Sequence, residues 1–245
     1  MIFKGGYSSY GHVLGVLVFK GSSPRIPGDA GNALTFDFPV SYEIVEGRFS
    51  DLIDGSEEIK QSLIRSAQKL EAQGVRAVIG DCGLMSLYQR DVAAKLSIPF
   101  FSSSLLLLPL IWKIQGETGK IGVVTGHCGY LKQKHLEACG AGTIPVIIQG
   151  MEEKDEFRRV VLEGNDTVDV DRMRQNVLDA VEDMLKKSGE IRSVLLECSN
   201  LCSFARDIRK TFRLSVYDLI AAAGIIKYSI WPADYSYSIE KFNLL

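Results

Sequence analysis

Two cysteines in this chain lie where a thiol could act on a bound small molecule. Cys82 comes shortly after the apolar run Val75–Ile79. Cys198 stands in the same relation to the run Ser193–Leu196. Such runs predict buried strands, and parallel α/β sheets bind ligands at the carboxyl ends of their strands. A helix starting after each cysteine would also lower the pKa of its thiol, because the helix N-terminus favours negative charge. Both cysteines are therefore candidate catalytic residues.

The segments around the two cysteines form an internal repeat. Residues 75–111 align without gaps on residues 191–227, so the two cysteines occupy the same position in each copy. The identical pairs are Arg76 and Arg192, Val78 and Val194, Cys82 and Cys198, Arg90 and Arg206, and Asp91 and Asp207. A duplicated chain can set its two copies face to face. One sulfur would then approach a bound ligand from each side.

The elements that position the cysteines follow from alternating apolar and amphipathic segments. We expect strands at 13–19, 39–45, 75–79 and 98–101, and again at 120–125, 144–148, 193–196 and 214–217. Helices are expected between them, at 56–70, 85–96, 131–139, 154–162, 170–187 and 202–212, with a last one from residue 219. This order predicts two α/β lobes with parallel sheets, 1–115 and 116–226. The tail 227–245 could pack on the first lobe.

Two opposed thiols suit a reaction at a carbon next to a carboxylate. A thiolate on one side removes the proton and a thiol on the other returns one, which inverts the centre. Hydroxyl and backbone N–H donors would absorb the charge that develops on the carboxylate. This chemistry needs neither a metal nor a cofactor, and the sequence shows no set of His and Cys residues with zinc-ligand spacing.

Composition narrows the class of protein further. The net charge of −2 and the scattered basic residues give no reason to expect nucleic acid as a partner. No apolar run reaches the roughly 18 residues of a membrane span, and we see no signal peptide. Five cysteines without a repeated spacing do not suggest a disulfide framework. We therefore expect a cytoplasmic protein.

Two motifs carry a resemblance to a known family. They are Gly80-Asp81-Cys82-Gly83 in the first half and Glu197-Cys198-Ser199-Asn200 in the second. With the duplicated halves, they make the chain resemble the aspartate/glutamate/hydantoin racemase superfamily. The loop Pro24–Asp29 is similar to one in an uncharacterised subgroup. The resemblance implies two pseudo-symmetric flavodoxin-like lobes, an active site in the cleft between them, one catalytic cysteine per lobe, no cofactor and a homodimer. Amino-acid racemases usually carry Cys-Asn-Thr at the first cysteine, whereas Gly83 and Leu84 follow Cys82 here.

The candidate substrate-binding residues lie at the strand ends. Arg25 could pair with a carboxylate through its two-pronged guanidinium group. The others could donate hydroxyl, amide or backbone N–H groups: Ser22, Gly83, Ser103, Ser104, Thr125, Ser199 and Asn200. The resemblance supports Ser199 and Asn200 in particular. Asp81 and Glu197 should point away from the cysteines if strand alternation continues through them.

The activity expected from these features is that of a racemase or epimerase, an isomerase acting on a small carboxylate such as aspartate, glutamate or a hydantoin. Within the superfamily, a decarboxylase of malonate-type acids and a maleate-type cis–trans isomerase are the alternatives. The second cysteine argues against the decarboxylase, which needs only one. A binding protein that kept the cleft without catalysis is a further hypothesis.

Overall fold

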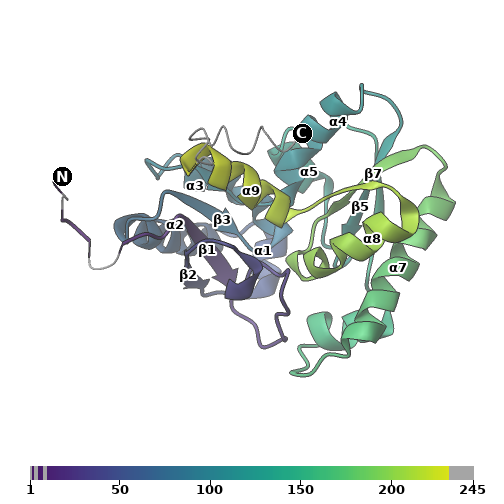
Figure 1. Cartoon of the computed structure of the whole chain (residues 1–245), viewed down its shortest axis with the longest axis horizontal. Coiled ribbons are helices and arrows are strands. Elements are labelled where there is room, and N and C mark those ends of the chain that lie inside the picture. The colour runs from purple at the N-terminus through teal and green to yellow at the C-terminus, as the bar shows by residue number, and fades with distance from the viewer. Residues whose placement is uncertain (1, 3–4, 8–9, 232–245) are drawn as a thin grey trace, which may run out of the picture.

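The computed structural model describes residues 2, 5–7 and 10–231, and its strands form two parallel four-stranded sheets (Figure 1). The first sheet has the order β2-β1-β3-β4 and the second the order β6-β5-β7-β8. Their bounds are β1 (Leu14–Phe19), β2 (Val40–Val45), β3 (Ala77–Gly80), β4 (Phe100–Phe101), β5 (Lys120–Thr125), β6 (Val146–Gly150), β7 (Ile191–Leu196) and β8 (Ser215–Tyr217). The matching strand order confirms the predicted fold of two similar α/β lobes.

Helices cover both sheets. The α-helices are α1 (Phe49–Asp54), α2 (Glu57–Ala72), α3 (Gln89–Ala93), α4 (Leu108–Ile114), α5 (Gln133–Ala138), α6 (Asp155–Phe157), α7 (Val170–Lys187), α8 (Ala205–Phe212) and α9 (Leu219–Ile230). Helix α2 begins where the sequence predicts, because the Ser56 hydroxyl accepts a hydrogen bond from the Ile59 N–H. Helix α1 was not expected.

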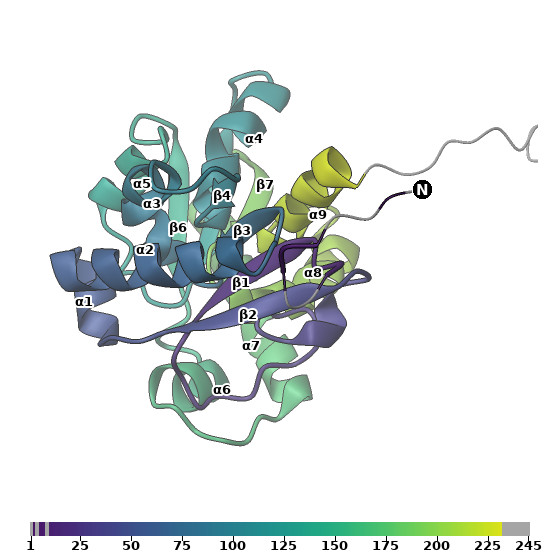
Figure 2. The ribbon, with the colours of Figure 1, turned by 90° about the vertical axis from the view of Figure 1, so that its left-hand side faces the viewer.

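The first sheet is packed between α2 and α9 (Figure 2). Gly15 in β1 allows α2 to come close, because a Cβ there would lie 2.9 Å from Leu70 Cδ1. On the other face, Leu219 and Ala223 of α9 join a core cluster with Val16. The chain thus leaves the second lobe after β8 and returns to the first. Residues 232–245, which include most of the predicted packing tail, lie outside the described residues.

The lobes share a hydrophobic core. One cluster of buried side chains contains Leu17 and Val78 of the first sheet together with Ile121, Leu136 and Leu195 of the second lobe. The second lobe also has a cluster of its own, beneath α7. The shared cluster fixes the sheets relative to each other, which matters because the predicted cleft lies between them.

The repeat extends to the local backbone after each cysteine. The helices predicted to follow the cysteines begin as 3-10 helices, η2 (Gly83–Tyr88) and η5 (Ser199–Phe204), before continuing as α3 and α8. Tyr88 and Phe204, which end them, have the same backbone angles, φ −104° and ψ 4°. The two halves therefore present their cysteines on equivalent turns.

Candidate functional site

Cys82 and Cys198 meet directly across the lobe boundary. Each lies two residues after the end of its strand, β3 or β7, and an antiparallel β-bridge pairs the two cysteines. Residues paired in this way have Cα atoms about 4.5–5.5 Å apart. The two thiols therefore belong to one site to which each lobe contributes the end of a central strand.

A cavity of about 370 Å³ opens at this junction and is lined by both cysteines. Of the predicted binding residues, five line it: Ser22, Arg25, Thr125, Ser199 and Asn200. Gly83, Ser103 and Ser104 are not in its wall. The Ser103 hydroxyl caps the next helical turn by accepting from the Leu105 N–H, and the Ser104 hydroxyl donates to the Leu196 carbonyl at 2.8 Å. Both serines are buried in these structural roles.

The pKa of each cysteine thiol is raised, contrary to the prediction. Burial is the main cause for both Cys82 and Cys198, and the carboxyl group of Glu197 is the next. The expected lowering by a helix dipole fails, because each cysteine precedes only a six-residue 3-10 helix and burial disfavours the thiolate. Both thiols are therefore protonated at neutral pH.

Glu197 is a buried acid at the centre of the cavity wall. Its carboxylate accepts a hydrogen bond from the Thr125 hydroxyl at 2.7 Å, and its side chain is 4% exposed. Burial raises the pKa of this carboxyl to about 7, while the Thr125 hydrogen bond opposes the rise. The opposite lobe accommodates it through Gly83, where any Cβ would overlap the carboxyl group. Glu197 is therefore a proton donor or acceptor poised near neutral pH.

Asp29 binds three of the eight residues that the sequence assigned to the substrate. Its carboxylate accepts from Arg25 at 2.9 Å, from Asn200 at 2.9 Å and from Ser199 at 3.2 Å. Arg25 also pairs with Asp81 at 2.8 Å. Burial raises the pKa of Asp81 to about 6, with Arg25 opposing the rise. These contacts join the first-lobe loop to the second lobe, and a binding role for their donors stays a prediction.

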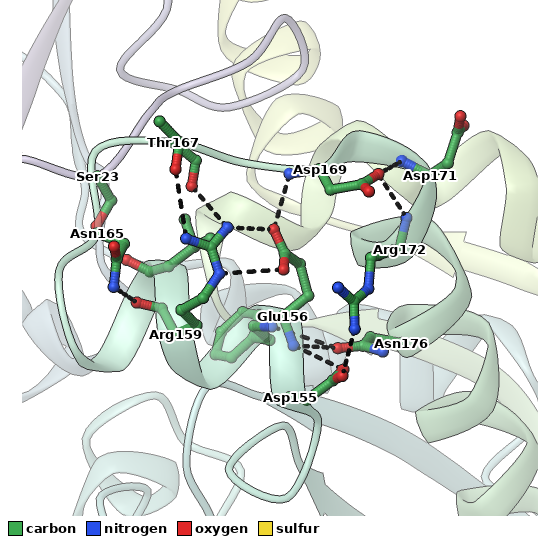
Figure 3. A network of polar contacts seen from close by, with 12 residues as sticks. Ser23, Asp155, Glu156, Arg159, Asn165, Thr167, Asp169, Asp171, Arg172 and Asn176 are labelled. Atoms are coloured by element: carbon green, nitrogen blue, oxygen red, sulfur yellow. Dashed lines mark hydrogen bonds and ion pairs between the residues drawn. The ribbon is translucent and has the colours of Figure 1, made fainter.

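The segment between β6 and α7 closes the outer side of the cavity with residues 161–164. Figure 3 shows the polar network that holds this segment. The buried Glu156 carboxylate accepts from the Arg159 guanidinium and from the Asp169 N–H, each at 2.7 Å. The Arg159 hydrogen bonds keep the pKa of Glu156 below its usual range. Ser23 donates to a backbone carbonyl of the same segment at 2.7 Å, so the first lobe also supports it.

Several cavity residues were missed from the sequence. The aromatic side chains are Phe19, Phe49 and Tyr130, and the main acidic ones are Asp81 and Glu197. Phe19 ends a strand at the ligand edge, which was a usable signal. Phe49 lies on the unexpected helix α1, and Tyr130 comes from the loop after β5, so only the fold brings them together. His127, in the loop after β5, also lines the cavity.

Within residues 2, 5–7 and 10–231 there is no group of three or more His, Cys, Asp or Glu side chains arranged to hold a metal ion. None of the helices in the described part of the chain has the length and apolar character that a membrane crossing requires.

The fold is similar to those of solved amino-acid racemases and of a decarboxylase. Glutamate racemase from Bacillus anthracis superposes with a TM-score of 0.60 at 18% identity, over 91% of this chain and 84% of that one. Arylmalonate decarboxylase gives 0.58 at 11% identity, over 89% and 92%. Aspartate racemase from Picrophilus torridus gives 0.57 at 15% identity, over 90% and 94%. The chain has the aspartate/glutamate racemase fold. The resemblance read from the two cysteine motifs is thus confirmed for the fold.

The relatives found by sequence are named for a different activity. The chain is 26% identical to a dimethylsulfoniopropionate lyase of Durusdinium sp. clade D, over 86% of this chain and 72% of that protein. It is 29% identical to dimethylsulfoniopropionate lyase 6 of Emiliania huxleyi, over 89% of this chain and 59% of that protein. The chain thus spans less than two thirds of the Emiliania enzyme. No family model matches the sequence.

These relatives overturn the predicted activity. They are lyases that cleave a carbon–sulfur bond, whereas the sequence analysis predicted a racemase of the isomerase class. The prediction went beyond the residues: a cysteine on each side of a cavity is compatible with proton transfer, but this arrangement does not distinguish inversion of a centre from elimination.

Proposed function

We propose that this protein is a carbon–sulfur lyase for sulfonium carboxylates of the dimethylsulfoniopropionate class. The observation that carries the proposal is the Cys82–Cys198 pair on one interlobe cavity, in a chain whose named relatives are such lyases. Racemisation and this elimination share their first step, the removal of a proton next to a carboxylate. A racemase fold can therefore serve a lyase if the neighbouring carbon bears a leaving group.

The reaction balances without any further reagent. A base on the enzyme removes a proton from the carbon next to the carboxylate. The electron pair of that C–H bond forms the new C=C bond, and the pair of the C–S bond leaves with the sulfur. The products are dimethyl sulfide, acrylate and one proton on the enzyme, which returns to solvent.

The substrate's own charge would activate the cysteines. The raised pKa values keep both thiols neutral, and a neutral thiol is a poor base. An opposite charge within about 4–6 Å lowers the pKa of an acid by about 1–3 units, so a bound sulfonium ion favours the thiolate. Glu197, with a pKa of about 7 beside both thiols, accepts the displaced proton. One thiolate then removes the substrate proton.

The test is product release from dimethylsulfoniopropionate by the purified protein. We expect equal amounts of dimethyl sulfide, by gas chromatography, and acrylate, by proton NMR. Cys82→Ser and Cys198→Ser should each lower kcat by about 10²–10⁴-fold if their thiol is the base or holds the base in place. Cys128→Ser is the matched control, because Cys128 is exposed and outside the cavity wall. Undiminished activity in both cavity variants, or no products from the wild type, contradicts the proposal.

The cellular location and the oligomeric state of the protein are also proposals. All five cysteines, each in the described part of the chain, are free thiols, which supports the expected cytoplasmic location. The homodimer implied by the family resemblance stays a prediction, to be checked by light scattering.

A further inference from the structure

Four aromatic rings from the two lobes form one continuous group on the cavity wall. Phe19 and Phe49 of the first lobe have ring centroids 5.8 Å apart, in an edge-to-face arrangement. Phe49 meets Tyr130 of the second lobe at 5.9 Å, also edge to face. Tyr130 stacks on His127 at 4.1 Å with an interplanar angle of 15°. All four residues line the cavity that holds the cysteines.

Packing alone does not account for this group. The Phe49 side chain is 42% exposed although it borders a cavity, and Tyr130 and His127 are only partly buried. Aromatic rings left open to a pocket supply apolar area and, on their faces, a negative potential. Such faces attract cations that cannot donate hydrogen bonds, and quaternary ammonium groups are recognised in this way.

Acidic groups near the rings add to this preference. Asp81, Glu163 and Glu197 all line the same cavity. The cations that line it are already paired: Arg25 with Asp29 and Asp81, and Lys20 with Glu46 at 3.2 Å. Two of the three carboxyl groups are paired as well, Asp81 with Arg25 and Glu163 with Arg158 at 3.7 Å. Within the described residues, Glu197 is the one of the three without a cationic partner. A cation that enters the cavity therefore meets the aromatic faces and the carboxyl group of Glu197.

We infer that Phe19, Phe49, Tyr130 and His127 form the subsite for a permanently charged onium group of the ligand. The inference rests on the proposed function and deepens it, because it names the part of the substrate that the site selects. The substrate class is then a carboxylate with a methylated sulfonium or ammonium group. A carboxylate of the same shape that lacks this positive charge is a poor ligand.

The test compares two unreactive ligands by isothermal titration calorimetry on the whole chain. One is trimethylammoniopropionate. The other is 4,4-dimethylpentanoate, which has the same shape and carboxylate but an uncharged quaternary carbon in place of the nitrogen. We expect the wild type to bind the ammonium compound at least about tenfold more tightly, the ratio that corresponds to about 1.4 kcal/mol. Equal affinities, or no binding of either ligand at about 10 mM, overturn the inference.

Variants locate the selectivity in the rings. Phe49→Leu and Tyr130→Leu keep apolar volume but remove a ring, so each should reduce the ratio by about threefold or more. Tyr130→Phe keeps an aromatic ring at this position and should keep the wild-type ratio of the two affinities. Tyr228→Leu is the matched control, since Tyr228 is 60% exposed on α9 and absent from the cavity wall. An unchanged ratio in both leucine variants contradicts the assignment to the rings.

Failure of this inference can be told apart from failure of the proposed function. The binding experiment needs no turnover, so selectivity for the ammonium ligand in a protein that releases no dimethyl sulfide supports the onium subsite and rejects only the lyase. Release of dimethyl sulfide by a protein that binds the two ligands equally rejects the subsite and leaves the lyase standing.

Discussion

At the scale of single residues, the sequence located the two cysteines of the cavity but not the buried acid beside them. Cys82 and Cys198 were found because each follows an apolar run. Glu197 was expected to point away from Cys198 by strand alternation, but β7 ends at Leu196 and the alternation stops there. The backbone then turns into the cysteine bridge and directs Glu197 into the cavity wall. The end of the strand at residue 196 was predicted, but the direction that the chain takes after it depends on the facing lobe and has no signal in the sequence.

Burial of Glu197 should make stability depend on pH. Its pKa rises from 4.5 to about 7 on folding, so between these values the unfolded chain has lost a proton that the folded protein keeps. The free energy of unfolding therefore falls as pH rises through this window and is lowest above it, by about 3 kcal/mol. The Glu197→Gln protein has no carboxyl group at this position, so its free energy of unfolding does not fall in this way. We expect it to raise Tm at about pH 8 and by less at about pH 4.

Thermal unfolding followed by circular dichroism at both pH values measures this effect. Glu152→Gln serves as a control, since it changes the same side chain at a partly exposed position. An equal change in Tm at the two pH values would show that Glu197 has no burial-linked titration.

At the scale of elements, most strands were predictable and the turns after them were not. Lys120–Thr125 and Val170–Lys187 were predicted with the bounds that β5 and α7 have. Their apolar patterns and the Asp169 N-cap are local signals. The 3-10 helices η2 and η5 follow the bridge between Cys82 and Cys198, a contact between residues far apart in the sequence that no local pattern predicts. Ser103 and Ser104 were misplaced for a similar reason, because β4 has only two residues and the chain turns into the core at once.

The loop that carries Asp29 should depend on Gly28. This glycine has φ +107°, and a Cβ there would lie 2.5 Å from Ser203 Cα of the second lobe. Gly28→Ala must therefore adopt an unfavourable backbone angle and also push the loop from η5. We expect a loss of about 2–4 kcal/mol in the free energy of unfolding, from chemical denaturation.

Gly116→Ala separates the two causes. Gly116 also has a positive φ, +77°, but no atom lies within 4 Å of a Cβ built there. The Gly116→Ala protein should lose only about 1 kcal/mol in the free energy of unfolding, which is the cost of a positive φ angle for alanine. Equal losses in the two variants would mean that the contact between the loop and η5 contributes nothing.

At the scale of the whole molecule, the two lobes should not fold separately. The largest core cluster combines Leu17 and Val78 with Leu136 and Leu195, and α9 covers the first sheet only after the chain has passed through the second lobe. A fragment of residues 1–115 lacks both sets of contacts. We expect its amide NMR signals to be poorly dispersed, while the full chain unfolds in one cooperative transition. Well-dispersed signals from the fragment would refute this.

The fit of Gly83 against Glu197 limits the order in which this sequence can change. A racemase-like asparagine at position 83 would collide with the carboxyl group from the facing lobe, so that substitution is harmful on its own. It becomes tolerable only after Glu197 has been replaced by a smaller side chain. Gly83→Asn and Glu197→Ser should therefore be strongly non-additive in expression and stability. The two similar halves are thus not free to diverge independently, because the side chain tolerated at position 83 of one half depends on the residue at position 197 of the other.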